Sequence, residues 1–194
     1  KPSGTTSLVL GTASGIHAWH NDYYLRTMRF NKNEDIAIYL MENHPELCED
    51  DVLRHDTICV RIPVKAPEGS ILRTETAIDT LERVKHFSTN WIKPGHNEGQ
   101  NTHNVSATIS IKQDEWETVG DWMWENREFY NGLSVLPYWG GTYQQAPFED
   151  ITEEEYNKRI VTLKELDLRN VQEANGNVEF GQVAACAGGA CAVE

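Results

Sequence analysis

The sequence lacks long apolar runs and is poor in basic residues. No stretch approaches the roughly 20 apolar residues of a membrane-spanning helix, and no basic, apolar leader opens the chain. We therefore expect a soluble, cytoplasmic protein with no membrane partner. Lys and Arg number 17 against 30 Asp and Glu, which gives a formal net charge of -13. Because proteins bind nucleic-acid polymers by neutralising their phosphates, this balance argues against DNA or RNA as a partner.

Cysteine is also scarce, and its positions are more informative than its number. Cys48 and Cys59 lie apart in the first third of the chain, whereas Cys186 and Cys191 lie near the C-terminus in the spacing C-A-G-G-A-C. This is not the pattern of a secreted disulfide framework. In a reducing compartment, a terminal dithiol between Gly and Ala indicates a redox pair or half of a metal site, although two incidental thiols would look the same.

The composition nevertheless supports one packed domain. The chain has 194 residues, 39% of them apolar, and six tryptophans. Residues 22–45 resemble two helices, the second ended by Pro45. Periodicity predicts strands at 57–64, 105–111 and 133–136, helices at 75–91 and 114–130, and a further helix from Thr152, whose hydroxyl and Glu155 form a capping pair.

This order of elements favours an α/β fold. The polar, Gly-containing segment after Asn170 is expected to be a mobile tail, so we divide the chain into residues 1–170 and 171–194. The chain starts with Lys1 instead of Met and its first motif begins at once, so we expect it to be a piece of something larger. A processed product would look the same.

The first residues combine features that suit a phosphate. The run P-S-G-T-T-S at 2–7 contains a glycine, four hydroxyls and a proline. Converging backbone N–H groups and hydroxyls hold phosphate oxygens, and glycine lets the backbone approach them closely. No Gly-Lys-Ser/Thr ends the run, so it is not a Walker motif. An ordinary loop with a Ser or Thr helix cap has the same composition.

Five segments in fixed order resemble the ribonucleotide reductases, most closely their adenosylcobalamin-dependent branch. They are K-P-S-G-T-T-S-L-V-L-G-T-A-S-G-I-H at 1–17, T-H-N-V-S-A-T-I-S-I at 102–111, L-S-V-L-P-Y at 133–138, Q-A-P-F-E-D-I at 145–151 and C-A-G-G-A-C-A-V at 186–193. The resemblance implies the C-terminal part of the family's ten-stranded α/β barrel. It also implies adenosylcobalamin as cofactor and a ribonucleoside di- or triphosphate as substrate. By position, the substrate phosphates would be held by Ser3, Gly4, Thr5 and Thr6.

The resemblance also assigns a role to the last two cysteines. In the family, a cysteine pair inside the barrel reduces the ribose and becomes a disulfide, which a second pair on the tail then reduces. Cys186 and Cys191 match that second pair, with thioredoxin or glutaredoxin as the external reductant. Neither Cys48, in an acidic run, nor Cys59, in a predicted strand, has the surroundings of the radical cysteine. We therefore expect the radical site in an upstream part, on a separate chain or a missing segment, and no turnover by this chain alone.

Several features have a less specific explanation. His17 and His20, followed by Asp22, could hold a metal, but a surface or supporting role is the simpler one. The predicted helix at 114–130 carries Trp116, Trp122, Trp124 and Tyr130, which we expect to pack against the barrel or the missing part. Glu153, Glu154 and Glu155 suit a solvated helix start. Two other functions remain open: an autonomous small-phosphate binding module, and a thioredoxin-linked dithiol protein without reductase activity.

Overall fold

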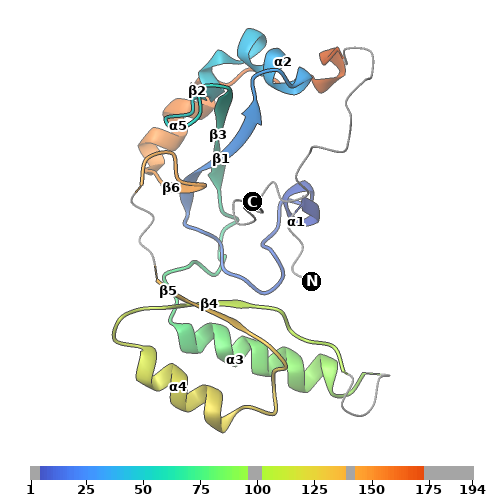
Figure 1. Ribbon diagram of the computed structural model, residues 1–194, viewed down its shortest axis with the longest axis vertical. Helices are drawn as coiled ribbons and strands as arrows, with labels where there is room; N and C mark the ends of the chain where they lie inside the picture. The colour runs from blue at the N-terminus through green and yellow to red at the C-terminus, as the bar shows by residue number, and fades with distance from the viewer. Residues whose placement is uncertain (1–4, 96–101, 139–142, 173–194) are drawn as a thin grey trace.

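The computed structural model describes residues 5–95, 102–138 and 143–172. Figure 1 shows two groups of elements, one around a four-stranded sheet and one around a two-stranded sheet. The described part is a mixed α/β structure, as the order of predicted elements indicated. None of its helices combines the length and the apolar composition needed to cross a membrane.

The four-stranded sheet is antiparallel, in the order β2-β3-β1-β6. The predicted strand at 57–64 is confirmed as the central strand β3. Helix α2, in the place of the second helix predicted within 22–45, packs one face of the sheet, where Leu40, Ile58 and Val60 share a core. The bounds are β1 Tyr23–Asn31, β2 Cys48–Asp50, β3 Thr57–Lys65, β6 Phe148–Asp150 and α2 Asp35–Asn43, with short 3-10 turns at Pro45–Leu47 and Leu168–Asn170.

The first helix predicted within 22–45 is wrong, because those residues form β1. All nine residues of β1 pair with β3, from Tyr23 opposite Lys65 to Asn31 opposite Thr57. Aromatic and β-branched residues in this run fit a pleated surface better than a helix, and the partner strand supplies the backbone hydrogen bonds. The strands β2 and β6 are only three residues long, which is too short for an alternating pattern to predict.

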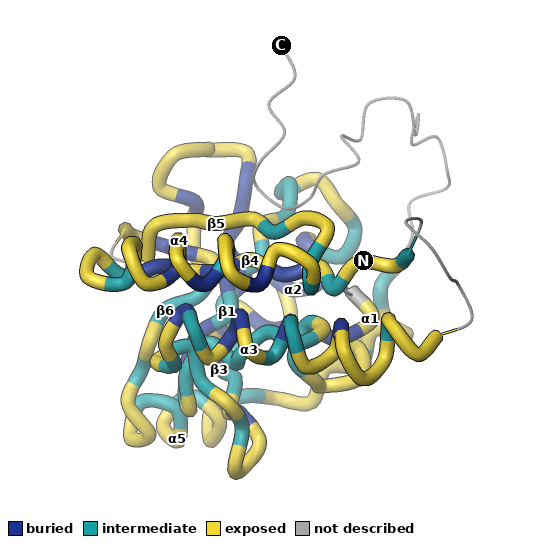
Figure 2. Tube along the Cα trace, turned by 90° about the horizontal axis from the view of Figure 1, so that it is seen from below, coloured by how far each residue is buried: buried dark blue, intermediate teal, exposed yellow. Residues whose placement is uncertain are grey.

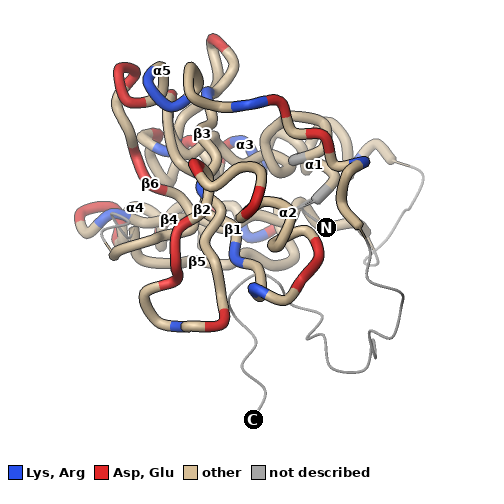
Figure 3. Tube along the Cα trace, turned by 90° about the horizontal axis from the view of Figure 1, so that it is seen from above, with Lys and Arg blue, Asp and Glu red and all other residues tan. Residues whose placement is uncertain are grey.

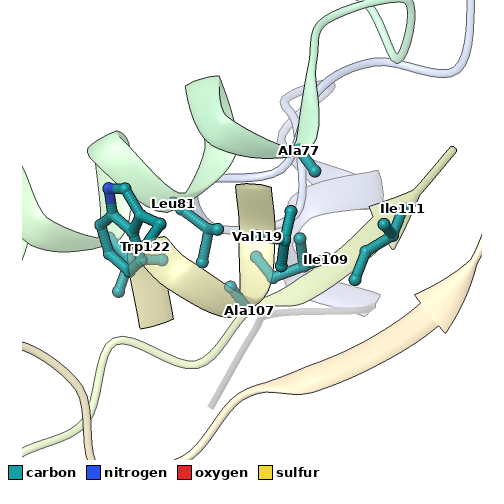
Figure 4. Close-up of a cluster of buried hydrophobic side chains, with 8 residues drawn as sticks. Ala77, Leu81, Ala107, Ile109, Ile111, Val119 and Trp122 are labelled. Atoms are coloured by element: carbon teal, nitrogen blue, oxygen red, sulfur yellow. The ribbon is translucent and has the colours of Figure 1, made fainter. Parts of the chain in front are cut away.

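The second group consists of the parallel strands β4 (Thr108–Ile111) and β5 (Ser134–Pro137) and the helices α3 (Ala77–Phe87) and α4 (Trp116–Glu125). Both helices lie on one face of the sheet (Figure 1). Along β4 the side chains alternate between exposed and buried, as the sequence pattern predicted. Figure 4 shows the resulting core, made by Ala77, Leu81, Val84, Ala107, Ile109, Ile111, Val119 and Trp122.

Helix ends explain two departures from the sequence pattern. A π-helical turn at Ser88–Ile92 continues α3, and its wider spacing leaves Trp91 76% exposed instead of on the buried face. At the start of α5 (Glu153–Thr162), Thr152 accepts a hydrogen bond from the N–H of Glu155, as predicted. The Glu155 carboxylate does not complete the capping pair, because it forms an ion pair with Arg159 at 3.0 Å.

Candidate functional site

The residues predicted to hold phosphate fall at the edge of the described part. Ser3 and Gly4 lie outside it, as do Cys186 and Cys191. Thr5 is the first residue of the five-residue helix α1 (Thr5–Val9), and Thr6 is exposed on it.

Glycine terminates α1. Gly11 has a φ of 60°, in the left-handed region that favours glycine. Its conformation lets the N–H of Thr12 donate to the carbonyl of Ser7 at 2.9 Å, which is the Schellman arrangement of a helix C-terminus. The motif therefore runs from the predicted loop into one turn of helix and then reverses sharply.

The chain leaving this turn is tied to the second group of elements. His17 Nδ1 donates to the carbonyl of Ser14 at 2.6 Å, and its Nε2 accepts from the N–H of Thr108 at 3.0 Å. A carbonyl is only an acceptor and a backbone N–H only a donor, so these contacts define the neutral tautomer with the proton on Nδ1. His17 thus links the motif at 1–17 to the first residue of β4.

Arg83 of α3 makes a second link. Its Nη1 donates to the carbonyl of Ile16 at 2.9 Å, and its guanidinium forms an ion pair with Glu75. The Ile16 side chain packs against the core of the same group. No sequence pattern pointed to Arg83 or Glu75, because their partners lie on distant segments or on the backbone.

The segments that carry the resemblance come together in space. The segment at 102–111 ends in β4 and the segment at 133–138 contains β5, and Ile109 lies opposite Val135 in the parallel pair. The segment at 145–151 contains β6, which pairs with β1. Three of the five segments therefore meet at or beside the β4–β5 sheet, and a fourth supplies the edge strand β6 of the antiparallel sheet.

A polar cluster joins β1, the turn after β2 and the segment before β6; its Asp51 and Gln145 are buried, whereas Arg29 is exposed. Arg29 pairs with Asp51 at 2.7 Å and donates to the backbone carbonyl of Gln145 at 2.9 Å. The Gln145 amide in turn donates to the carbonyl of Asp50 and accepts from the N–H of Val52. Gln145 holds these contacts at a φ of 57°, a strained value for a residue with a side chain.

The shifted pKa values keep Asp51 ionised and the Cys59 thiol protonated at neutral pH. The backbone N–H of Leu53 and the guanidinium of Arg29 lower the pKa of Asp51 to about 2. Burial, followed by the neighbouring carboxylate of Asp51, raises the pKa of the Cys59 thiol to about 11. Cys59 lies fully buried in β3. A protonated, inaccessible thiol is not a nucleophile.

His17 and His20, for which a surface or supporting role is preferred over a metal site, have separate partners. His20 Nε2 lies 3.0 Å from the carboxylate of Asp150, and its ring stacks on Phe148. Burial and the nearby Arg73 guanidinium lower the pKa of His20 to about 4. Among the described residues, no group of three or more His, Cys, Asp or Glu side chains is arranged to hold a metal ion.

The predicted aromatic group lies partly in the core and partly at the surface, and the predicted acidic group lies at a helix start. Trp116, Trp122 and Trp124 lie on α4, but Tyr130 does not, because the helix predicted at 114–130 ends at Glu125. Trp122 is buried in the core and stacks on Tyr130, whereas Trp124 is 73% exposed. Glu153, Glu154 and Glu155 form the acidic first turn of α5 (Figure 3), as predicted.

The described residues form a mixed α/β structure that contains a parallel sheet of two strands. The chain is similar to known proteins in both sequence and structure. No family model matches the chain. A solved B12-dependent (class II) ribonucleotide reductase superposes with a TM-score of 0.66 and 26% identity, over 83% of this chain and 22% of that one. The predicted resemblance to the adenosylcobalamin-dependent branch is therefore confirmed.

Particular relatives extend this similarity to the whole chain. All of it aligns with the adenosylcobalamin-dependent ribonucleoside-triphosphate reductases of Lactobacillus delbrueckii subsp. bulgaricus (29% identical over 213 residues), Lactobacillus leichmannii (28% over 213) and Lactobacillus gasseri (27% over 197). The chain spans 26% of the length of each of these relatives.

Proposed function

We propose that the chain is part of an adenosylcobalamin-dependent ribonucleotide reductase, which converts ribonucleoside triphosphates to deoxyribonucleotides. In this proposal residues 1–170 contribute the last strands of a ten-stranded α/β barrel and the substrate-phosphate loop. Residues 171–194 contribute the cysteine pair that restores the reduced enzyme. The relatives that support the substrate and the cofactor carry both in their names.

The observation that carries the barrel proposal is the incomplete β4–β5 sheet. Parallel sheets occur almost only where other elements cover both of their faces. A two-stranded sheet alone is only marginally stable. All four residues of β5 are exposed, including Val135 at 39% and Leu136 at 52% (Figure 2). Strands from the rest of the reductase would pair with the edges of this sheet. Other parts of the reductase would cover its open face.

The phosphate loop is proposed to consist of Ser3, Gly4, Thr5 and Thr6. Hydrogen bonds to a charged oxygen contribute roughly 1.5–3 kcal/mol each, so three or four of them hold a triphosphate without a lysine. The links from His17 to Thr108 and from Arg83 to Ile16 support this role, because they fix the end of the loop motif against β4 and α3.

The proposed tail chemistry is thiol–disulfide exchange. Reduction of the ribose converts its 2′-hydroxyl to hydrogen and water, and two thiols of the upstream part supply the electrons and become a disulfide. A thiolate of Cys186 or Cys191 attacks that disulfide, and the other cysteine then resolves the mixed disulfide. The two upstream thiols are restored, and the oxidised tail pair is reduced by thioredoxin or glutaredoxin.

The described residues do not form a cofactor site by themselves. A cavity of about 320 Å³ lies between the end of α3 and the loops at 102–105 and 128–131. That volume is at the lower end of ligand pockets and is too small to enclose a corrin ring with its nucleotide tail. We therefore assign adenosylcobalamin to the complete reductase and derive no step through it from this chain.

Complementation tests the proposed function. The chain is mixed with a polypeptide that covers the rest of a relative's length, adenosylcobalamin, a ribonucleoside triphosphate and reduced thioredoxin, and deoxynucleotide formation is measured. We expect activity only with both polypeptides. Nucleotide binding by the isolated chain without any complemented activity would favour the phosphate-binding module, and disulfide exchange with thioredoxin without complemented activity would favour the dithiol protein.

A further inference from the structure

The chain after α5 stays on the antiparallel group instead of leaving it at the end of that helix. The helix ends at Thr162 and buries none of its own residues. Beyond it, Leu163 and Val171 both pack against the core that α2 shares with β3. Figure 1 shows the turn at Leu168–Asn170 beside α2. The segment 163–171 is therefore anchored to this core at both of its ends.

Two polar contacts lie between these anchor points. The Glu46 carboxyl, in the turn after α2, has a lowered pKa because it accepts from its own backbone N–H and from the N–H of Lys164. The carboxylate of Asp167 accepts from the N–H of Arg169 at 3.2 Å and pairs with the guanidinium of the same residue at 2.7 Å. The path of the chain up to Val171 is thus restricted by apolar packing at its ends and by polar contacts between them.

The position of Val171 determines the length of chain between the core and the terminal cysteines. Cys186 follows Val171 by 15 residues and Thr162 by 24. A flexible chain of the shorter length has a mean end-to-end distance of about 20 Å and spans at most about 50 Å. The longer chain would have a mean of about 27 Å. Because effective concentration falls roughly as the −3/2 power of tether length, anchoring at Val171 instead of Thr162 raises that of Cys186 roughly twofold.

We propose that Leu163 and Val171 are positioning residues for thiol–disulfide exchange, because they anchor the base of the tail to the core between α2 and β3. This inference rests on the proposed function of Cys186 and Cys191. In the exchange, the two tail thiols become a disulfide as the upstream disulfide becomes two thiols, and thioredoxin or glutaredoxin then reduces the tail. Val171 sets the tether over which the cysteines reach the upstream disulfide, which lies within about 50 Å of it.

The test follows the products of the complemented enzyme without any external reductant. A fully reduced enzyme holds the upstream dithiol and the tail dithiol, so it forms about two deoxynucleotides per active site. The second product requires transfer from the tail, and rapid quenching measures its rate. A flexible Gly/Ser insert of about 15 residues after Gln172 doubles the tether and should slow the second product roughly threefold. The same insert after Glu165, in the exposed coil between Leu163 and Val171, should leave the rate unchanged.

Point variants separate anchoring of the tail from stability of the fold. Val171→Asp releases the chain back to Leu163 and should slow the second product roughly twofold. The first product, and turnover supported by a small dithiol, do not use the tail and should be unchanged. Val171→Ile keeps the apolar contact and should react at the normal rate. Leu168→Asp is the matched control, because it changes a side chain that is 57% exposed in the same turn.

The outcomes distinguish this inference from the proposed function of the tail. If Cys186→Ser forms no second product but the two inserts have equal effects, the tail functions as proposed and the anchoring at Val171 is overturned. A slower first product in Val171→Asp would also overturn it, because the packing would then serve the fold alone. A normal second product in Cys186→Ser would overturn the proposed tail and this inference together.

Discussion

His17 Nε2 accepts a hydrogen bond from the backbone N–H of Thr108 at 3.0 Å, across 91 residues of sequence. This contact joins the end of the loop motif to the first residue of β4. Two segments that resemble ribonucleotide reductases separately are thereby held in one place. The position of the loop depends on this contact and on the hydrogen bond from Arg83 to Ile16.

The first prediction concerns this contact. His17→Ala should lower the free energy of unfolding by about 1 kcal/mol, the usual contribution of one hydrogen bond. In the complemented enzyme it should raise the KM for nucleotide more than it lowers kcat, because the loop is displaced and the chemistry is elsewhere. His55→Ala, at an exposed histidine, is the control. An unchanged KM in His17→Ala would show that the contact between His17 and Thr108 does not affect substrate binding.

The second prediction concerns the proposed phosphate loop. Ser3→Ala and Thr5→Val each remove one hydroxyl, so each should raise the KM for a ribonucleoside triphosphate roughly tenfold, which corresponds to about 1.4 kcal/mol. Thr118→Val, the same kind of change at an exposed position of α4, should leave the KM unaltered. Steady-state kinetics of the complemented enzyme measure both. Identical KM values for all three variants would show that the loop does not bind the substrate.

The third prediction concerns Asp51. Its lowered pKa means that the fold binds the carboxylate form, so its contribution to stability is complete above the unfolded pKa of about 3.9 and is lost as the pH falls toward about 2. Asp51→Asn should therefore lower the free energy of unfolding at pH 7 by about 2 kcal/mol, and the difference should shrink below pH 4. Denaturant unfolding across this range measures it. Asp114→Asn is the exposed control, and a difference independent of pH would contradict the assignment.

The fourth prediction concerns His20, whose pKa is lowered to about 4. The fold favours the neutral ring, so stability is complete above the unfolded pKa of about 6.5 and declines as the pH falls toward 4. His20→Phe keeps the stacking on Phe148 and removes the titration. The variant should lose less stability than the unmodified chain between pH 6.5 and 4 in denaturant titrations. Parallel pH profiles would show that His20 does not contribute.

Some of the fold could be predicted from the sequence, for identifiable reasons. The strands β3 and β4 have alternating or β-branched patterns, and α3 and α5 begin at threonines whose hydroxyls cap them. The strand β1 could not be predicted, because its conformation depends on pairing with β3 across 26 or more residues of sequence. The local sequence pattern of a segment does not specify the distant strand with which it pairs.

The site was less predictable than the fold. Residue types and spacing pointed to the loop motif and the cysteine pair, and the resemblance assigned their roles; Ser3, Gly4, Cys186 and Cys191 lie outside the described part. The supports at Arg83 and Gln145 could not be found from sequence. Arg83 acts through the carbonyl of Ile16, and Gln145 needs a φ of 57° that no sequence rule assigns to glutamine.

The proposed tail is tested most directly by counting turnovers. In the complemented enzyme with its upstream thiols already reduced, Cys186→Ser and Cys191→Ser should each form about one deoxynucleotide per active site at the normal rate. With thioredoxin as the sole reductant, both should then stop. A small dithiol, which reaches the upstream disulfide without the tail, should restore turnover. Sustained thioredoxin-supported turnover by either variant would contradict the assignment of Cys186 and Cys191.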